Sequence, residues 1–113
     1  MTHNPPVSQI SPLELSDRLV AGDIPILVDV REYHEIEIAD LPDHGQLRIP
    51  TGEFLQRIDE VPTDAEVVVY CRSGGRSAWA AALLMGRGHE RVLNLSGGIL
   101  GWRDEVDPTL RAY

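Results

Sequence analysis

The chain has 113 residues, enough for one domain with one hydrophobic core. Hydrophobic residues make up 42% of it and charged residues 25%, which is ordinary for a soluble globular protein. Its formal net charge of −8 argues against nucleic acid or an acidic membrane surface as a partner. Cys71 is the single cysteine, which excludes an internal disulfide, a CxxC redox pair and a thiolate zinc site within one chain.

Targeting and metal-binding signals are missing from the sequence. It contains no apolar run of about 18 residues, the length of a membrane-spanning helix, and residues 1–6 lack the apolar stretch of a signal peptide. We therefore expect a cytoplasmic protein, because a free thiol suits a reducing compartment. We expect no bound metal and no required cofactor. The histidines show no ligand spacing, and we expect all of them to be exposed to solvent: His3, His34, His44 and His89.

The predicted elements begin after a polar, proline-containing start. Residues 1–8 predict a flexible arm, and residues 9–113 predict a single domain. Ser11 can cap a helix that has Pro12 at its first position and stops near Gly22. This helix carries four apolar residues: Leu13, Leu15, Leu19 and Val20.

Short apolar runs and helical patterns alternate along the rest of the chain. Four segments are predicted strands: 26–30, 47–49, 66–70 and 91–95. Four further segments are predicted helices: 33–40, 52–58, 77–87 and 99–105. The helix at 33–40 is expected to bury Ile36 and Ile38 only in part. The acidic run over residues 32–43 is expected to be a solvated face rather than a metal site, with a docking face for a partner protein as the alternative. The alternation of elements favours an α/β domain with a parallel sheet and helices on both of its faces.

Cys71 directly follows the strand predicted at residues 66–70, and a helical pattern begins a few residues later. Ligands of open parallel sheets bind beyond the carboxyl ends of the strands, so we expect the thiol at that edge. Unpaired N–H groups and the helix dipole favour an anion there. A thiol in this position should lose its proton readily, and the thiolate is the nucleophilic form.

The residues after Cys71 are suited to holding an anion. Gly74 and Gly75 allow backbone conformations closed to other residues, so the N–H groups of the loop could point inward as in an anion nest. Arg72 and Arg76 add positive charge, and either could contact an oxyanion. The candidate substrate-binding residues are Arg72, Ser73, Gly74, Gly75, Arg76 and Ser77.

Ser77 is a candidate helix cap whose hydroxyl could also donate to the sulfur. The alternative for the whole segment is an ordinary turn that buries Cys71 as a small apolar residue. The combination of a strand, a cysteine, two arginines, two glycines and a helix start favours a reactive site instead.

The segment from Cys71 to Ser77 resembles the active-site loop of single-domain rhodaneses, which are sulfurtransferases. The resemblance extends over nearly the whole chain, because other family motifs occur in the same order. These motifs are Ile10-Ser11-Pro12, Val28-Asp29-Val30-Arg31-Glu32, Ile49-Pro50, Asn94-Leu95-Ser96-Gly97-Gly98 and Trp102.

This resemblance implies a rhodanese-like fold of three layers, with a mostly parallel five-stranded sheet between helices. It implies that Cys71 takes sulfane sulfur from thiosulfate or a persulfide and passes it, through a covalent persulfide, to a thiophilic acceptor. It also implies structural support of the active loop by four residues: Asp29, Arg31, Gly97 and Gly98. For Asp29 and Arg31, direct contact with the substrate is the alternative.

Residues 102–108 and 38–42 resemble, more narrowly, the rhodanese domains fused to E1-like enzymes that activate ubiquitin-like sulfur carriers. Small sulfur anions are therefore the first partners implied, and a persulfide donor protein or such a carrier is a second. A relay module with little activity on free thiosulfate remains an open alternative. Residues 41–46 depart from the family's Gly-His-Ile-Pro-Gly-Ala pattern, which affects one wall of the expected site.

Loop length separates two activities in proteins of this kind. Rhodaneses have four residues between the cysteine and the loop arginine, whereas the related cell-cycle phosphatases have five. Four residues lie between Cys71 and Arg76, and Ser77 follows. The sequence therefore favours sulfur chemistry over a phosphatase, and the lack of a second cysteine also argues against an arsenate reductase.

Overall fold

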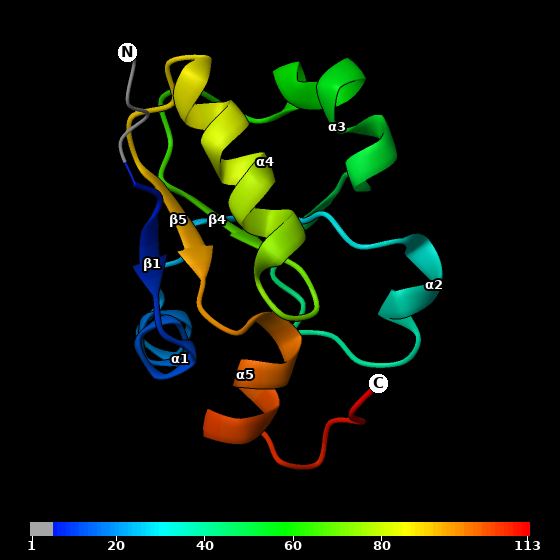
Figure 1. Ribbon diagram of the computed structural model, residues 1–113. Coiled ribbons are helices and arrows are strands. Elements are labelled where there is room, and N and C mark those ends of the chain that lie inside the picture. Colours follow the sequence, from blue (N-terminus) through cyan, green and yellow to red (C-terminus); the bar gives the residue numbers. More distant parts are fainter. Residues whose placement is uncertain (1–5) are drawn as a thin grey trace.

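Five parallel strands form the central layer of the computed structural model, which describes residues 6–113 (Figure 1). The strands are β1 (Ser8–Ile10), β2 (Ile26–Asp29), β3 (Leu47–Arg48), β4 (Val67–Tyr70) and β5 (Val92–Leu95). Their order across the sheet is β1-β5-β4-β2-β3, and every neighbouring pair is parallel. All four residues of the central strand β4 are buried, as its continuous apolar sequence requires.

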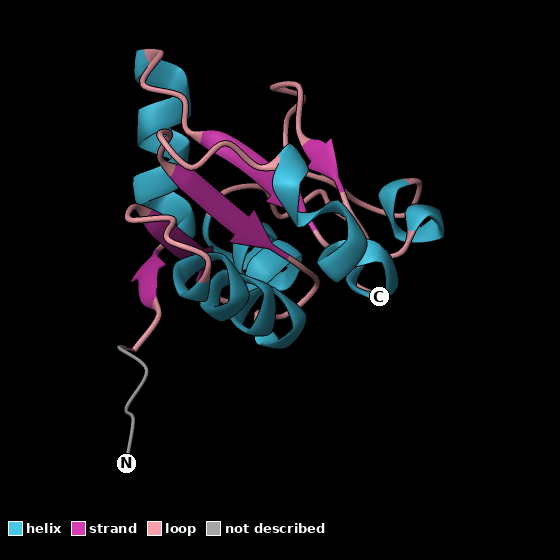
Figure 2. Ribbon diagram, turned by 90° about the horizontal axis from the view of Figure 1, so that it is seen from above, coloured by secondary structure: helices cyan, strands magenta, loops and turns pink. Residues whose placement is uncertain are grey.

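Helices cover both faces of this sheet, as the view from above shows (Figure 2). One face packs against α1 (Pro12–Ala21) and α5 (Gly98–Glu105). The other packs against α3 (Thr51–Arg57), the 3₁₀ turn η1 (Ile58–Glu60) and α4 (Gly75–Gly86). The short helix α2 (Tyr33–Ile36) follows the carboxyl end of β2. The predicted three-layer α/β fold is confirmed, and the sheet is parallel throughout.

Local sequence signals set the bounds of α1. The Ser11 hydroxyl accepts a hydrogen bond from the N–H of Glu14 at 3.1 Å, and Pro12 occupies the first turn. Gly22 ends the helix with a left-handed φ of 80°. Among its apolar residues, two face the core and two are exposed, because one helix can turn only one side to the sheet: Leu15 and Leu19 inward, Leu13 and Val20 outward.

The first strand, β1, was not predicted from the sequence. Ser8 belongs to it rather than to the predicted arm, and residues 1–5 of that arm lie outside the described residues. Ile10 pairs with Leu95 of β5, so the strand is defined by a partner far along the chain. Within residues 6–113, no helix combines the length and hydrophobicity needed to cross a bilayer.

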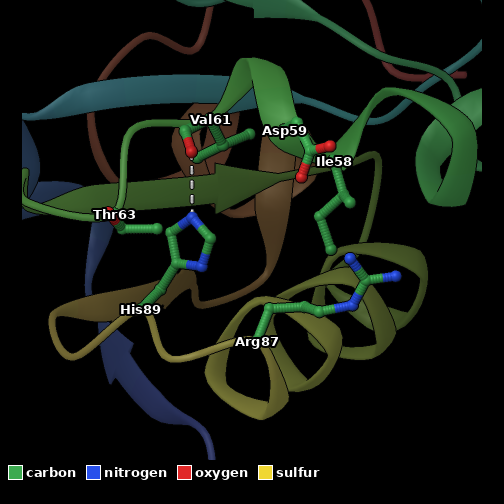
Figure 3. Close-up of a pocket in the computed structure, with 6 residues that line it drawn as sticks. All are labelled: Ile58, Asp59, Val61, Thr63, Arg87 and His89. Carbon is green, nitrogen blue, oxygen red and sulfur yellow. Dashed lines mark hydrogen bonds between the residues drawn. The ribbon is translucent and has the colours of Figure 1, made fainter.

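His89 is buried, so the expectation that it would be exposed was wrong. Its Nε2 lies 3.0 Å from the backbone carbonyl oxygen of Val61 (Figure 3). Its Nδ1 lies 2.9 Å from the backbone carbonyl oxygen of Leu84. The ring borders a hollow of about 220 Å³ beside Arg87, which lies at the end of α4. Both ring nitrogens thus face backbone carbonyl oxygens, and we assign no ligand-binding role to this imidazole.

Candidate active site

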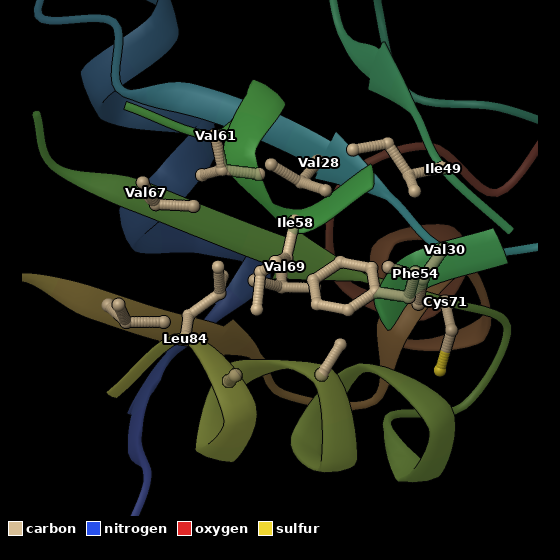
Figure 4. Close-up of a cluster of buried hydrophobic side chains, with 13 residues drawn as sticks. Val28, Val30, Ile49, Phe54, Ile58, Val61, Val67, Val69, Cys71 and Leu84 are labelled. Atoms are coloured by element: carbon tan, nitrogen blue, oxygen red, sulfur yellow. The ribbon is translucent and has the colours of Figure 1, made fainter. Parts of the chain in front are cut away.

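Cys71 lies at the carboxyl edge of the sheet, directly after the central strand β4 and four residues before α4 begins. Its side chain closes one end of the buried cluster between the sheet and α4 (Figure 4). The residue is only 1% exposed. The position follows from the sequence, because the apolar run before Cys71 ends where the loop begins.

Several donors surround the sulfur. The N–H of Gly74 donates to Sγ at 3.1 Å, and the hydroxyl of Ser77 lies 3.3 Å from it. Burial raises the pKa of the Cys71 thiol, but hydrogen bonds from the Ser77 hydroxyl and from the amides of Ser77, Gly74 and Ser73 outweigh it. The net pKa of the thiol is therefore lowered, which increases the thiolate fraction at neutral pH.

Ser77 is not the helix cap that the sequence suggested. The cap is Gly74, and α4 begins at Gly75, two residues earlier than predicted. Ser77 therefore lies in the first turn, fully buried, with its hydroxyl 2.5 Å from Asn94 Oδ1 and 3.2 Å from the Gly74 carbonyl oxygen. The hydroxyl has one proton to donate. A thiolate at Cys71 is the one anionic acceptor among these three, which favours donation to sulfur once the thiol ionises.

Two glycines shape the loop. Gly74 has a φ of 110°, a conformation that side chains rarely adopt, and this turn directs its N–H at the sulfur. A Cβ at Gly98 would lie 2.3 Å from the carbonyl oxygen of Cys71, so the start of α5 can approach the loop only with glycine there. Gly97 caps α5. Gly75 differs from the expectation, because it has ordinary helical geometry with open space around its Cα.

The close approach at Gly98 fixes the loop backbone. The N–H of Ile99 donates to the Cys71 carbonyl oxygen and the N–H of Leu100 to that of Arg72, each at 3.0 Å. These donors belong to the first turn of α5, where N–H groups have no partner within the helix. The two carbonyl groups are thereby turned toward α5.

Arg76 is held by a buried glutamate that the sequence did not single out. Its Nη1 and Nη2 donate to Glu35 Oε2 and Oε1 at 2.7 and 2.9 Å, and Glu35 is 6% exposed. The expectation of a solvated acidic face is therefore wrong for Glu35. The Arg76 bond, against the opposing effect of burial, lowers the pKa of Glu35 from 4.5 to about 2. Glu35 raises the pKa of Arg76, and the nearby Cys71 thiolate adds to this.

Arg72, the other loop arginine, contacts Tyr113. Its guanidinium carbon lies 5.3 Å from the centre of the tyrosine ring, and its Nε donates to the Tyr113 backbone oxygen. Both arginines expected at the substrate are thus engaged by protein groups, and both remain partly exposed.

Asp29 and Arg31 form a buried ion pair at the end of β2, with Arg31 Nε 2.9 Å from Asp29 Oδ1. Arg31 also contacts Asp40 at 3.0 Å, and Arg48 reaches Asp29 and Asp40 at 2.6 and 2.7 Å. Asp40 in turn accepts from the Tyr70 hydroxyl at 2.8 Å. This network links β2, β3, β4 and the acidic segment at the edge of the sheet where Cys71 lies.

The atypical segment 41–46 is a loop that leads into β3. Gln46 holds it: its amide nitrogen donates to the Pro42 carbonyl oxygen at 3.0 Å, and its amide oxygen accepts from the His44 N–H at 2.8 Å.

A hollow of about 340 Å³ adjoins the active loop, lined by Thr51, Gly75, Arg76 and Trp79.

Sequence reasoning missed three residues at this site: Glu35, Asn94 and Tyr113. Glu35 belongs to the acidic run over residues 32–43, and nothing local in that run shows that it meets Arg76. Asn94 occurred in a recognised motif, but nothing local showed that it reaches Ser77. Tyr113 gave no signal, because its partners lie at least 41 residues away along the chain.

Comparison with known proteins decides the family. The model of the rhodanese-like domain matches residues 11–105, which include the whole loop around Cys71. The chain belongs to the rhodanese-like domain family. A sulfurtransferase of Allochromatium vinosum is 45% identical to this rhodanese-like domain over 96 residues, which cover 85% of the chain and 88% of that protein.

Other relatives contain a similar domain within longer chains. The probable adenylyltransferase/sulfurtransferase MoeZ of Mycobacterium tuberculosis is 36% identical over 110 residues, or 94% of this chain and 27% of MoeZ. The crystal structure of the reduced CoADR-RHD protein of Bacillus anthracis superposes with a TM-score of 0.79 at 28% identity, covering 94% of this chain and 18% of that one. This rhodanese-like domain therefore spans only about a quarter of MoeZ and less of the second protein.

Proposed function

We propose that the protein is a cytoplasmic sulfurtransferase that carries sulfane sulfur on Cys71. The observation that supports this most is the set of donors around Sγ: the Gly74 N–H at 3.1 Å and the Ser77 hydroxyl at 3.3 Å, with a lowered thiol pKa. These groups favour a negative charge on sulfur, which both the thiolate and a persulfide anion carry. The resemblance to named sulfurtransferases supports the same activity.

In the first stage, the Cys71 thiolate attacks the outer sulfur of thiosulfate. A new S–S bond forms at Cys71 as the original S–S bond breaks, and sulfite leaves with the bonding electron pair. The product is a Cys71 persulfide, with no net oxidant or reductant consumed. The charge carried by the departing sulfite is opposed by Arg72 and Arg76 and by the N–H groups at the start of α4.

In the second stage, a thiophilic acceptor attacks the terminal sulfur of the persulfide. The acceptor gains that sulfur, and Cys71 leaves as the thiolate, ready for another cycle. Cyanide serves as the acceptor in an assay and gives thiocyanate. Two displacements through a covalent intermediate predict ping-pong kinetics. No metal or organic cofactor takes part in either displacement.

A relay between proteins is the second candidate. The similarity to MoeZ, whose name joins adenylyltransferase and sulfurtransferase, supports a persulfide donor protein or a ubiquitin-like sulfur carrier as partner. In that case the same Cys71 persulfide forms, but free thiosulfate is a poor donor.

The test compares two donors with one acceptor. In the first arm, thiosulfate is the donor and cyanide the acceptor, and thiocyanate production is measured for the wild type and Cys71→Ser. In the second arm, a cysteine desulfurase supplies labelled sulfur, and its transfer to cyanide is measured for the same two proteins. Turnover of thiosulfate that Cys71→Ser lacks supports the first candidate, and transfer from the desulfurase alone supports the relay. Full transfer by Cys71→Ser would overturn both. Hydrolysis of an aryl phosphate that depends on Cys71 would instead favour a phosphatase.

A further inference from the structure

The segment after α5 returns to the active loop. Residues 107–113 leave the end of α5 and bring the chain end close to α2 (Figure 1). Leu110 and Tyr113 pack against the core on the α1/α5 face, and Arg103 Nε donates to the Leu110 carbonyl oxygen at 2.8 Å. The segment is therefore held at Leu110 and at Tyr113, which lies beside the loop.

The ring and backbone of Tyr113 hold the first loop arginine. Arg72 directly follows Cys71, and its guanidinium carbon lies 5.3 Å from the ring centre of Tyr113. The Nε of Arg72 donates to the backbone oxygen of the same residue. Arginine has many rotamers in water, and these two contacts restrict them before any substrate arrives.

The hydroxyl of Tyr113 reaches the second loop arginine through Glu35. It accepts from Arg31 Nη1 at 2.9 Å and donates to Glu35 Oε1 at 3.1 Å. Glu35 holds both terminal nitrogens of Arg76. Tyr113 thus contacts Arg72 directly. It also holds the carboxylate of Glu35, which in turn binds Arg76.

We propose that Tyr113 is a positioning residue for anion binding, which orients Arg72 and, through Glu35, Arg76 at the mouth of the Cys71 loop. This rests on the proposed function, in which those arginines oppose the charge of the donor anion. Preorganised charges bind an anion without a further loss of side-chain freedom. The donors to Sγ come from Gly74 and Ser77 and do not involve Tyr113, so its loss should weaken binding of the anion and leave the reactivity of the thiolate unchanged.

The first test separates binding from chemistry. Single-turnover formation of the Cys71 persulfide is measured over a range of thiosulfate concentrations for the wild type, Tyr113→Phe and Tyr113→Ala. Tyr113→Phe keeps the ring and loses the hydroxyl, and it should raise the half-saturating concentration about fivefold. Tyr113→Ala also loses the ring and should raise it about tenfold or more. The saturating rate should change less than about twofold in both variants.

The second test does not depend on sulfur transfer. The rate at which Cys71 is alkylated is measured with neutral iodoacetamide and with anionic iodoacetate. In both Tyr113 variants the iodoacetate rate should fall relative to the iodoacetamide rate, which itself should stay constant. Tyr33→Phe is the matched control, because this tyrosine is exposed and its hydroxyl contacts Arg57 at 3.1 Å, away from the loop.

The outcomes distinguish the two proposals. The role of Tyr113 would be overturned if both variants kept the wild-type ratio of iodoacetate to iodoacetamide rates and the wild-type half-saturating concentration of thiosulfate. An equal fall in the alkylation rate with iodoacetate and with iodoacetamide would also overturn it, since it would indicate a general structural defect. If the wild type forms no persulfide from either thiosulfate or a cysteine desulfurase but the ratio of iodoacetate to iodoacetamide rates still falls in the Tyr113 variants, the proposed function fails while the positioning role stands.

Discussion

At Cys71, burial and hydrogen bonding act on the thiol in opposite directions. Burial disfavours the charged thiolate, whereas the Ser77 hydroxyl and three loop amides favour it. The Ser77 hydroxyl is the largest of the favourable contributions. The charge state of the nucleophile therefore depends on a residue six positions further along the chain, in the first turn of α4.

Replacing Ser77 with alanine should raise the pKa of the Cys71 thiol. Alkylation by iodoacetamide requires the thiolate, so its rate rises with pH through the pKa of the thiol. We expect the midpoint of this pH profile to be lowered in the wild type relative to an ordinary thiol and to move upward in Ser77→Ala. Ser16→Ala in α1 is the control and should leave the profile unchanged. A Ser77→Ala profile identical to the wild type would show that the hydroxyl does not stabilise the thiolate.

Glu35 should make stability depend on pH. Its folded pKa of about 2 lies below its ordinary value of 4.5, so its contribution is complete above about pH 5 and is lost as the pH falls toward 2. This difference corresponds to about 3 kcal/mol at neutral pH. The gap in unfolding free energy between the wild type and Glu35→Gln, measured with urea, should be largest near pH 7 and shrink in acid.

The neighbouring residue Glu37 provides the matched control for this experiment. It is exposed, so Glu37→Gln should change the free energy of unfolding by less than about 1 kcal/mol at any pH. A gap for Glu35→Gln that is the same at pH 7 and pH 3 would contradict the assignment of the ion pair with Arg76.

Among the contacts between elements, the one between α5 and the active loop leaves no room for a side chain at Gly98. Gly98 has a φ of 56°, and a Cβ there would overlap the backbone of Cys71 and Arg72. Gly98→Ala should therefore destabilise the protein by about 2–4 kcal/mol and slow the alkylation of Cys71. Chemical unfolding and iodoacetamide kinetics measure the two effects.

Gly52→Ala is the matched control, because a Cβ at this position in α3 meets nothing within 4 Å. It should be neutral or stabilise the protein by less than about 1 kcal/mol, since alanine favours helix more than glycine does. Equal effects of the two substitutions would show that close approach at Gly98 is not what the glycine provides.

The elements that local sequence signals define were predictable, and those defined by distant partners were not. The cap at Ser11 and the glycine at Gly22 identify α1, and the apolar run 67–70 identifies β4. β1 has three residues, of which only Ile10 is buried, so it shows neither alternation nor a continuous apolar run. The segment forms a strand because it pairs with an edge of β5.

On the scale of the whole molecule, the loop residues could be found from the sequence, but their partners could not. Cys71, Gly74 and Ser77 lie within seven consecutive residues, and all contribute to one local structure. Glu35 lies 41 residues before Arg76, and Tyr113 lies 41 residues after Arg72. Glu35 reaches Arg76 from α2, which follows the carboxyl end of β2, and Tyr113 reaches Arg72 from the segment after α5.

The measurement that tests the central claim most directly is the intact mass of the protein after incubation with thiosulfate. A covalent persulfide on Cys71 predicts a gain equal to one sulfur atom in the wild type. Cyanide should remove this gain, and Cys71→Ser should never show it. A wild type that turns over thiosulfate without any such adduct, or an adduct of the same mass on Cys71→Ser, would contradict the account.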